Sequence, residues 1–111
     1  MQKQIKGHPD YFVTDKGKII SMKGRCEREL RPDTSTGYAR VSIDGCKRYV
    51  SDIVAEHFLK RPMNPSYKIF FIDDDPWNCE VENLVWLSPS DIQRFSQYTV
   101  EYRRQVLGLG N

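Results

Sequence analysis

The sequence predicts an α+β protein built around a small N-terminal antiparallel sheet, and three observations carry this prediction. Short β-type runs bounded by turn residues fill the first half of the chain. An Asp44-Gly45 pair separates two alternating runs, which is a strong signal for a type I′ hairpin turn. The second half has apolar residues at helical spacing and a helix-start signature at Ser88-Pro89.

The composition fits a single domain over residues 1–111. A chain of 111 residues with 39% hydrophobic residues can bury one modest core. Its 17 basic and 15 acidic residues leave a net charge of +2, so a nucleic-acid surface would require segregated charge. The three cysteines include no C-x-x-C pair, which argues against structural zinc. Without a signal core or a long apolar run, we expect a cytoplasmic protein of the host cell with no membrane partner.

Residues 5–50 are expected to form a β-rich module that begins with a small hairpin. Strands at 11–13 and 18–22 flank a turn at residues 15–17, where Gly17 supplies the flexible position. Residues 23–36 are charged and rich in turn formers, so we expect mostly loop there, with a short strand at 29–31.

A second hairpin spans residues 38–50, and its two-residue turn sets the register. Ile43 then pairs with Cys46 and Val41 with Arg48 on a face that is mostly core. The opposite face combines cationic, hydroxyl and aromatic groups, which suits DNA phosphates, although an ordinary solvated face has the same pattern. The candidate DNA-binding residues on this face are Tyr38, Arg40, Ser42, Lys47 and Tyr49.

Two helices are expected in the rest of the chain, with a strand and an acidic turn between them. Ser51 is a suitable cap for a helix that ends near Lys60. A strand at 67–72 then leads into the acidic turn, and residues 78–84 are expected to form a turn or a short helix. Ser88 starts the second helix, which is expected to run over residues 88–107 as one element. Three arginines off its apolar stripe are further candidates for DNA contact: Arg94, Arg103 and Arg104.

Four segments in series resemble the HNH homing endonucleases of phages and self-splicing introns. They are G-x-x-x-Y-F-V-T-D-K-G-K-I-I-S from Gly7, G-Y-A-R-V-S-I from Gly37, V-S-D-I-V-A-E-H-F from Val50 and I-D-D-D-P-W-N-C-E-V-E-N-L-V-W from Ile72. Together they cover about residues 5–92. The resemblance implies a phage-derived protein with the family's β-rich DNA-binding module, a ββα-metal-like HNH unit over 51–92, and a C-terminal helix.

The resemblance also implies that the catalytic groups of the family are missing. Its pattern [DN]-H-x-D-G-N-x-x-N aligns without a gap from Phe70, which puts the general base at Phe71 and the two metal ligands at Phe70 and Ile92. The family's basic His-Arg pair on the preceding helix is replaced by Ser51-Asp52. Phenylalanine has no lone pair for a cation or a proton. We therefore expect no catalytic residue, no cofactor, and binding to double-stranded DNA without cleavage.

Two other functions stay open at this point. Phe71 and Trp77, beside the vacated cleft, could anchor a host protein, so that the chain would inhibit a host factor; the alternative is that the phenylalanines are simply core. An active DNA endonuclease with a rebuilt site is the other function. Its divalent metal would bind Asp73, Asp74 and Asp75, with help from Glu80 or Glu82, and His57 would serve as the base. An acidic turn is more often a solvated loop.

Overall fold

The computed structural model describes residues 1–24 and 26–107 and has the α+β architecture that the sequence predicts. A four-stranded antiparallel sheet has the order β1-β2-β3-β4. Its strands are β1 (Gln2–Ile5), β2 (His8–Thr14), β3 (Ile19–Ser21) and β4 (Arg28–Leu30). Two further antiparallel pairs are β5 (Arg40–Ile43) with β6 (Cys46–Tyr49), and β7 (Lys68–Phe71) with β8 (Leu84–Leu87).

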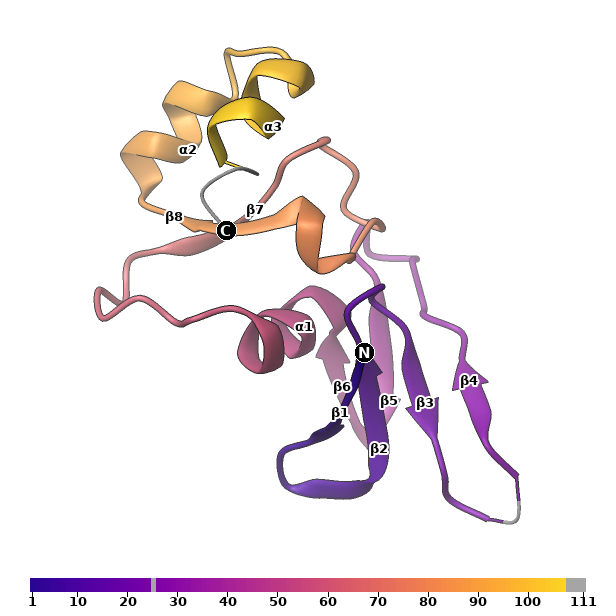
Figure 1. Cartoon of the computed structure of the whole chain (residues 1–111). Coiled ribbons are helices and arrows are strands. Elements are labelled where there is room, and N and C mark those ends of the chain that lie inside the picture. The colour runs from indigo at the N-terminus through magenta and orange to yellow at the C-terminus, as the bar shows by residue number, and fades with distance from the viewer. Residues whose placement is uncertain (25, 108–111) are drawn as a thin grey trace.

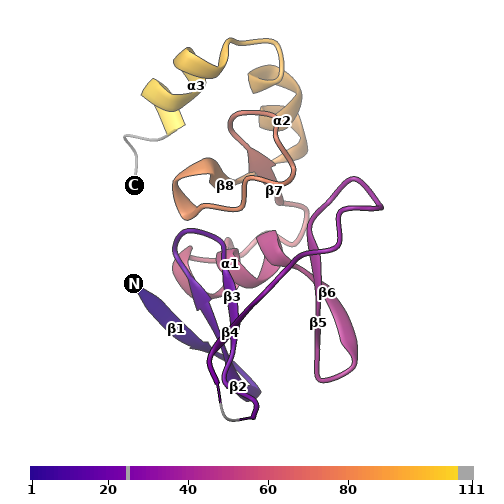
Figure 2. The ribbon, with the colours of Figure 1, turned by 90° about the vertical axis from the view of Figure 1, so that its right-hand side faces the viewer.

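Three helices complete the fold: α1 (Val50–Phe58), α2 (Pro89–Phe95) and α3 (Val100–Leu107). A short 3₁₀ helix, η1 (Val81–Asn83), leads directly into β8. In Figure 1 the β7–β8 pair lies between α1 on one side and the α2–α3 pair on the other, while the β-sheet and the β5–β6 hairpin lie beyond α1. Figure 2 shows the same succession of layers from the side, with the β5–β6 hairpin set apart from the sheet.

The β5–β6 hairpin confirms both the predicted turn and the predicted register. Asp44 and Gly45 have φ angles of 50° and 84°, as a type I′ turn requires. Ile43 faces Cys46 and Arg40 faces Tyr49 across the pair. The turn is tied to the neighbouring sheet, because the Asp44 carboxylate accepts from Lys23 Nζ at 2.5 Å and lies 2.7 Å from His8 Nδ1. These contacts lower the pKa of Asp44, the Lys23 ammonium contributing most.

Two features differ from the prediction: the strand β1 and the residue at which α1 begins. β1 was not expected, because only Ile5 of its four residues is buried and the rest are polar. α1 begins at Val50, with Tyr49 in the N-cap position, so Ser51 does not cap it. The reason is that β6 runs into α1 without a linker: the Val50 N–H donates to the Ala39 carbonyl at 3.0 Å, and this hydrogen bond sets where the helix starts.

The expected single helix over 88–107 is wrong: the segment forms α2 and α3 with a turn between them. Ser88 does cap α2, accepting from the Asp91 N–H at 3.2 Å. The helix stops after Phe95, and Thr99 Oγ1 accepts from the Tyr102 N–H to start α3. The turn lets the Arg103 guanidinium reach back to the carbonyl groups of Phe95 and Ser96, which are orphan acceptors at the end of α2.

Two clusters of buried apolar side chains hold these layers together. The larger cluster joins the sheet, the hairpin and α1, and includes Val13, Ile43, Ile53 and Leu84. The smaller one lies between β7, β8 and α2; its buried members are Phe70, Ile72, Leu87 and Phe95. None of the helices within residues 1–24 and 26–107 has the length and hydropathy that a membrane crossing requires.

The turn between β2 and β3 packs against the acidic segment that follows β7. Gly17, at a φ of +79°, lies so close to Cys79 that a Cβ atom there would sit 2.6 Å from the Cys79 carbonyl oxygen. The Val81 N–H also donates to the Asp15 carbonyl at 2.8 Å. A glycine is therefore required here both by its backbone conformation and by the close approach.

Candidate functional site

The segment from Asp73 to Asn83 forms a closed turn in which polar side chains satisfy each other. Asn83 Oδ1 accepts from the Asp73 N–H at 3.0 Å, and Asn83 Nδ2 donates to Asp73 Oδ1 and to the Asn78 carbonyl, both at 2.9 Å. Asn78 Nδ2 donates to the other Asp73 oxygen at 2.8 Å. These hydrogen bonds lower the pKa of Asp73 despite its partial burial. The Asp73 carboxylate is therefore a structural element of the turn.

The other two aspartates of the turn are also engaged by the protein. Asp74 has a φ of 63° at the position where the homing endonuclease pattern has glycine, and its carboxylate lies 2.9 Å from Arg103 Nη1. Asp75 accepts from the Trp77 N–H at 3.0 Å. Within the described ranges, no group of three histidine, cysteine, aspartate or glutamate side chains has a geometry that could hold a metal ion. Each of the three carboxylates is thus hydrogen-bonded or ion-paired within the protein.

His57, the base expected for such a rebuilt site, links α1 to the start of the sheet instead. Its Nε2 accepts from the Lys6 N–H at 3.0 Å, and its Nδ1 lies 2.7 Å from the Ile53 carbonyl oxygen. Both ring nitrogens are thus used on backbone groups, which is the pattern of a structural histidine. Glu80 and Glu82 line a separate hollow with Arg104.

The three positions that match the family's base and metal ligands do converge. Phe70, Phe71 and Ile92 line one surface hollow of about 290 Å³, together with Tyr38 and Asp74. Phe70 is 6% exposed and belongs to the smaller core cluster, while Phe71 is half-buried. The hollow offers no lone pair from these three side chains, so it cannot run the metal-dependent hydrolysis of the family through them.

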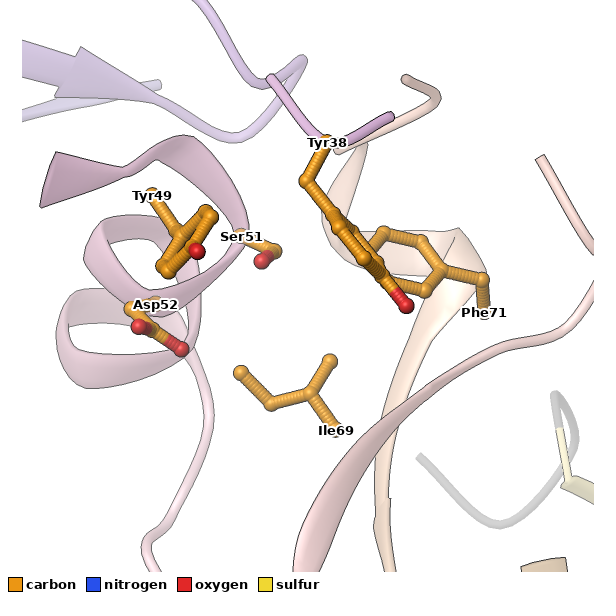
Figure 3. A pocket seen from close by; sticks show the side chains of 6 residues that line it. All are labelled: Tyr38, Tyr49, Ser51, Asp52, Ile69 and Phe71. Carbon is orange, nitrogen blue, oxygen red and sulfur yellow. The ribbon is translucent and has the colours of Figure 1, made fainter. Parts of the chain in front are cut away.

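A second hollow of about 320 Å³ adjoins the first, since Tyr38, Ile69 and Phe71 line both. We call this second hollow the aromatic groove. Figure 3 shows Tyr49, Ser51 and Asp52 on one wall, facing Tyr38 and Phe71 across the opening, with Ile69 at the base. Its lining residues are Tyr38, Tyr49, Ser51, Asp52, Ile69 and Phe71.

The aromatic groove contains one carboxylate, that of Asp52. Partial burial raises the pKa of Asp52, and the negative charge of Glu56 adds to the effect, while Arg48 and Arg61 oppose it. Arg48 itself is paired with Glu56, at 2.8 Å. Asp52 therefore makes this wall of the aromatic groove acidic, where the homing endonuclease pattern has arginine.

The hairpin face predicted to contact DNA is present, with one acidic neighbour that the sequence did not reveal. Ser42 and Lys47 are exposed and Arg40 is half-buried. Asp33 lies between the two cations, 3.5 Å from Arg40 Nη2 and 3.6 Å from Lys47 Nζ. Hydrogen bonds from Ser35 lower the pKa of Asp33 to about 2, with smaller contributions from the two cations. The carboxylate is thus ionised at neutral pH and offsets part of the positive charge.

The three arginines of the C-terminal segment have different surroundings. Arg94 is exposed and pairs with Asp91 at 3.3 Å, and Arg104 is exposed. Arg103, in contrast, is 2% exposed, and its guanidinium donates to the carbonyl groups of Phe95, Ile72 and Ser96. Its donors are committed to the protein, so Arg103 is not available for a DNA phosphate.

The two aromatic residues expected to anchor a protein partner occupy different places. Trp77 is 58% exposed on the acidic turn. Phe71 packs beside Tyr38, with ring centroids 6.1 Å apart, and lines both hollows. Trp77 lines neither of these hollows in the described residues 1–24 and 26–107.

Comparison with known proteins supports the fold. No family model matches the chain, and no curated protein matches its sequence. A solved structure described as "DNA binding and cleavage by the HNH homing endonuclease I-HmuI" is similar to it, with a TM-score of 0.70 and 22% sequence identity. The match covers 96% of this chain and 65% of the other, so the chain spans somewhat less than two thirds of that endonuclease chain. At this identity the likeness establishes an HNH-like fold, and it does not establish an activity for this chain.

Proposed function

We propose that this chain binds double-stranded DNA without cleaving it. The HNH-like fold gives the proposal its context, because the similar endonuclease is described as binding and cleaving DNA. The observation that carries it is the convergence of Phe70, Phe71 and Ile92 on one hollow. The three positions that would hold the base and the metal ligands are close together in space, and each carries a hydrocarbon side chain.

The expected DNA-contacting surface is the outer face of the β5–β6 hairpin. Arg40 and Lys47 supply positive charge for phosphates, Ser42 supplies a hydroxyl, and the exposed Tyr38 and Tyr49 rings extend the face. Arg94 and Arg104, on α2 and α3, are additional exposed cations. Because the net charge is only +2, we expect modest affinity that depends strongly on salt.

The test is an electrophoretic mobility shift with a 30-bp duplex at two salt concentrations, combined with a plasmid nicking assay. We expect a shift that weakens from about 50 to about 200 mM salt, persists in chelator, and is accompanied by no nicking in Mg²⁺ or Mn²⁺. The double variant R40A/K47A should bind more weakly at low salt and lose about two units of salt slope. The variant D33N should bind more tightly, because it removes the negative charge beside both cations.

The matched control is K16A/K60A, which removes the same charge from exposed lysines outside the hairpin face. It should retain most of the binding. Absence of any shift at low salt would overturn DNA binding, and metal-dependent nicking by the purified chain would overturn catalytic silence. Equal losses of DNA affinity in the two double variants would show that the interface is not on the hairpin.

Protein interaction is a second candidate function, and the exposure of Trp77 favours it. A tryptophan with 58% of its surface exposed on a turn that is internally hydrogen-bonded is a rigid anchor for a partner. Pull-down from host lysate with the wild-type chain and with W77A, each with and without nuclease treatment, tests it. A nuclease-resistant partner that W77A loses would support inhibition of a host factor; capture that disappears with nuclease would contradict it.

A further inference from the structure

We propose that the aromatic groove is a receptor for an arginine side chain of a partner protein. The proposal goes beyond the DNA binding assigned to the outer face of the hairpin, although Tyr38 and Tyr49 border both surfaces. It rests on three features of the groove: the arrangement of its rings, its unpaired carboxylate and its shape.

The rings of the groove present their faces in different directions around one opening. The Tyr38 and Tyr49 centroids are 6.0 Å apart with an interplanar angle of 79°, and Tyr38 and Phe71 are 6.1 Å apart at 40° (Figure 3). At these separations the rings contact one another. The face of an aromatic ring is its electron-rich part, so the ring surfaces that border the opening attract a cation that lies against them. Such an arrangement favours a cation over an anion or a phosphate.

The Asp52 carboxylate adds a full negative charge to this environment. It lies on the wall opposite Tyr38 and Phe71 (Figure 3), and no ion pair engages it among residues 1–24 and 26–107. Of the two arginines that influence Asp52, Arg48 is bound to Glu56, and Arg61 lines a neighbouring hollow together with Asp52. Partial burial raises the pKa of Asp52, with Arg48 and Arg61 opposing the shift, and a cation in the groove would stabilise the charged form further. A DNA phosphate in the same position would be repelled.

The shape of the groove selects arginine among the cationic side chains. A guanidinium is planar, so it can stack on a tyrosine face while two of its N–H groups donate in parallel to one carboxylate. The Ile69 side chain at the base of the groove can pack against the aliphatic stem of an incoming arginine. A volume of about 320 Å³ accommodates one such side chain with its stem.

The proposal is tested by titrating the full ¹⁵N-labelled chain with N-acetyl-L-arginine amide and following its amide resonances. The matched probe is N-acetyl-L-citrulline amide, which has nearly the same shape and hydrogen-bonding edge but no charge. We expect millimolar binding of the arginine probe, with shifts centred on residues 51, 52, 69 and 71. The citrulline probe should bind at least about tenfold more weakly.

The variant D52N distinguishes the contribution of the carboxylate to binding from that of the rings. It should weaken the arginine probe about tenfold while its spectrum shows an intact fold. The matched control is D10N, which removes the same charge from an exposed residue of β2 and should leave the affinity unchanged. If D52N fails to fold, Y38A provides the second variant and should weaken the probe by loss of a ring wall.

Three results would overturn the proposal. The first is an absence of shifts in the groove at 100 mM arginine probe. The second is an equal response to arginine and citrulline, or equal affinities of D52N and D10N. The third is a DNA duplex that shifts the amides of residues 51, 52, 69 and 71 and competes with the probe, since the groove would then be a nucleic-acid site. A duplex that shifts residues 42 and 47 alone would support both assignments.

Discussion

Phe70 and Phe71 are chemically identical neighbours on β7, yet they have different roles in the molecule. The Phe70 ring is buried with Ile72, Leu87 and Phe95, and the Arg103 guanidinium lies 5.2 Å from its centroid. Phe71 is half-buried and forms a wall between two surface hollows. Strand alternation places the two rings on opposite faces of β7: Phe70 lies in the smaller core cluster, and Phe71 lines the groove and packs against the larger cluster.

The comparison distinguishes a side of β7 that packs into the smaller core cluster from a side that lines the groove. On the Phe70 side, the acidic turn keeps a closed network of hydrogen bonds around Asp73 and Asn83. On the Phe71 side, the groove is open, apolar and mildly acidic. We therefore expect the fold to depend more on the first side than on the second. The following predictions test this division.

The largest difference is expected between alanine substitutions of the two phenylalanines. F70A removes a buried ring and should lower the free energy of unfolding by about 4 kcal/mol. F71A removes a half-exposed ring and should cost about 1 kcal/mol. Urea denaturation of both variants measures the two values. Equal losses would mean that the groove side also supports the fold, and the division above would be wrong.

Arg103 and Arg104 give a second matched pair. R103A leaves three carbonyl groups without their charged donor and removes the partner of Asp74, so we expect a loss of about 3 kcal/mol. R104A should change stability by less than about 0.5 kcal/mol, because this side chain is exposed. Thermal or urea unfolding distinguishes them. A neutral R103A would show that the turn between α2 and α3 is held by other contacts.

The closed network of the acidic turn is tested at Asn83. N83A removes three hydrogen bonds from a buried position and should lower the free energy of unfolding by about 2 kcal/mol. N64A is the control, since Asn64 also accepts from nearby groups but lies in an exposed turn. Hydrogen exchange of the Asp73 amide should accelerate in N83A alone. Retained protection of that amide would contradict the role given to Asn83.

The smallest expected effect is a difference in thiol reactivity. Burial raises the pKa of Cys79 to about 11, and the negative charges of Asp75 and Asp52 add to the shift, whereas Cys26 and Cys46 are exposed. Only a thiolate reacts, so a thiol reagent at pH 8 should label two thiols in the folded protein and three in urea. The folded state holds the Cys79 proton more tightly than the unfolded chain, so stability should fall as pH rises from about 9 toward 11. Rapid labelling of Cys79 at pH 8 would show that the turn opens readily.

Local signals in the sequence predicted elements whose conformation depends on a few adjacent residues. Asp44-Gly45 specified its hairpin because both residues take positive φ, and Ser88-Pro89 specified the start of α2 because a cap and a pre-set φ act within one turn. The convergence of Phe70, Phe71 and Ile92 was recoverable only through the resemblance to homing endonucleases, since nothing local links residues so far apart. The position of Asp33 beside Arg40 and Lys47 was not predicted, because neither a local pattern nor the resemblance indicates it.

The sequence by itself determined the strand-rich first half, the hairpin register and the acidic turn. All of these follow from residue type and spacing within short segments. Tertiary structure decided where α1 begins, that the last helix breaks in two, that Arg103 is buried, and that Asp52 faces aromatic rings. Each of these depends on contacts between segments distant in the chain, such as that of Arg103 with Ile72. Contacts of this kind do not produce a periodic pattern in the sequence.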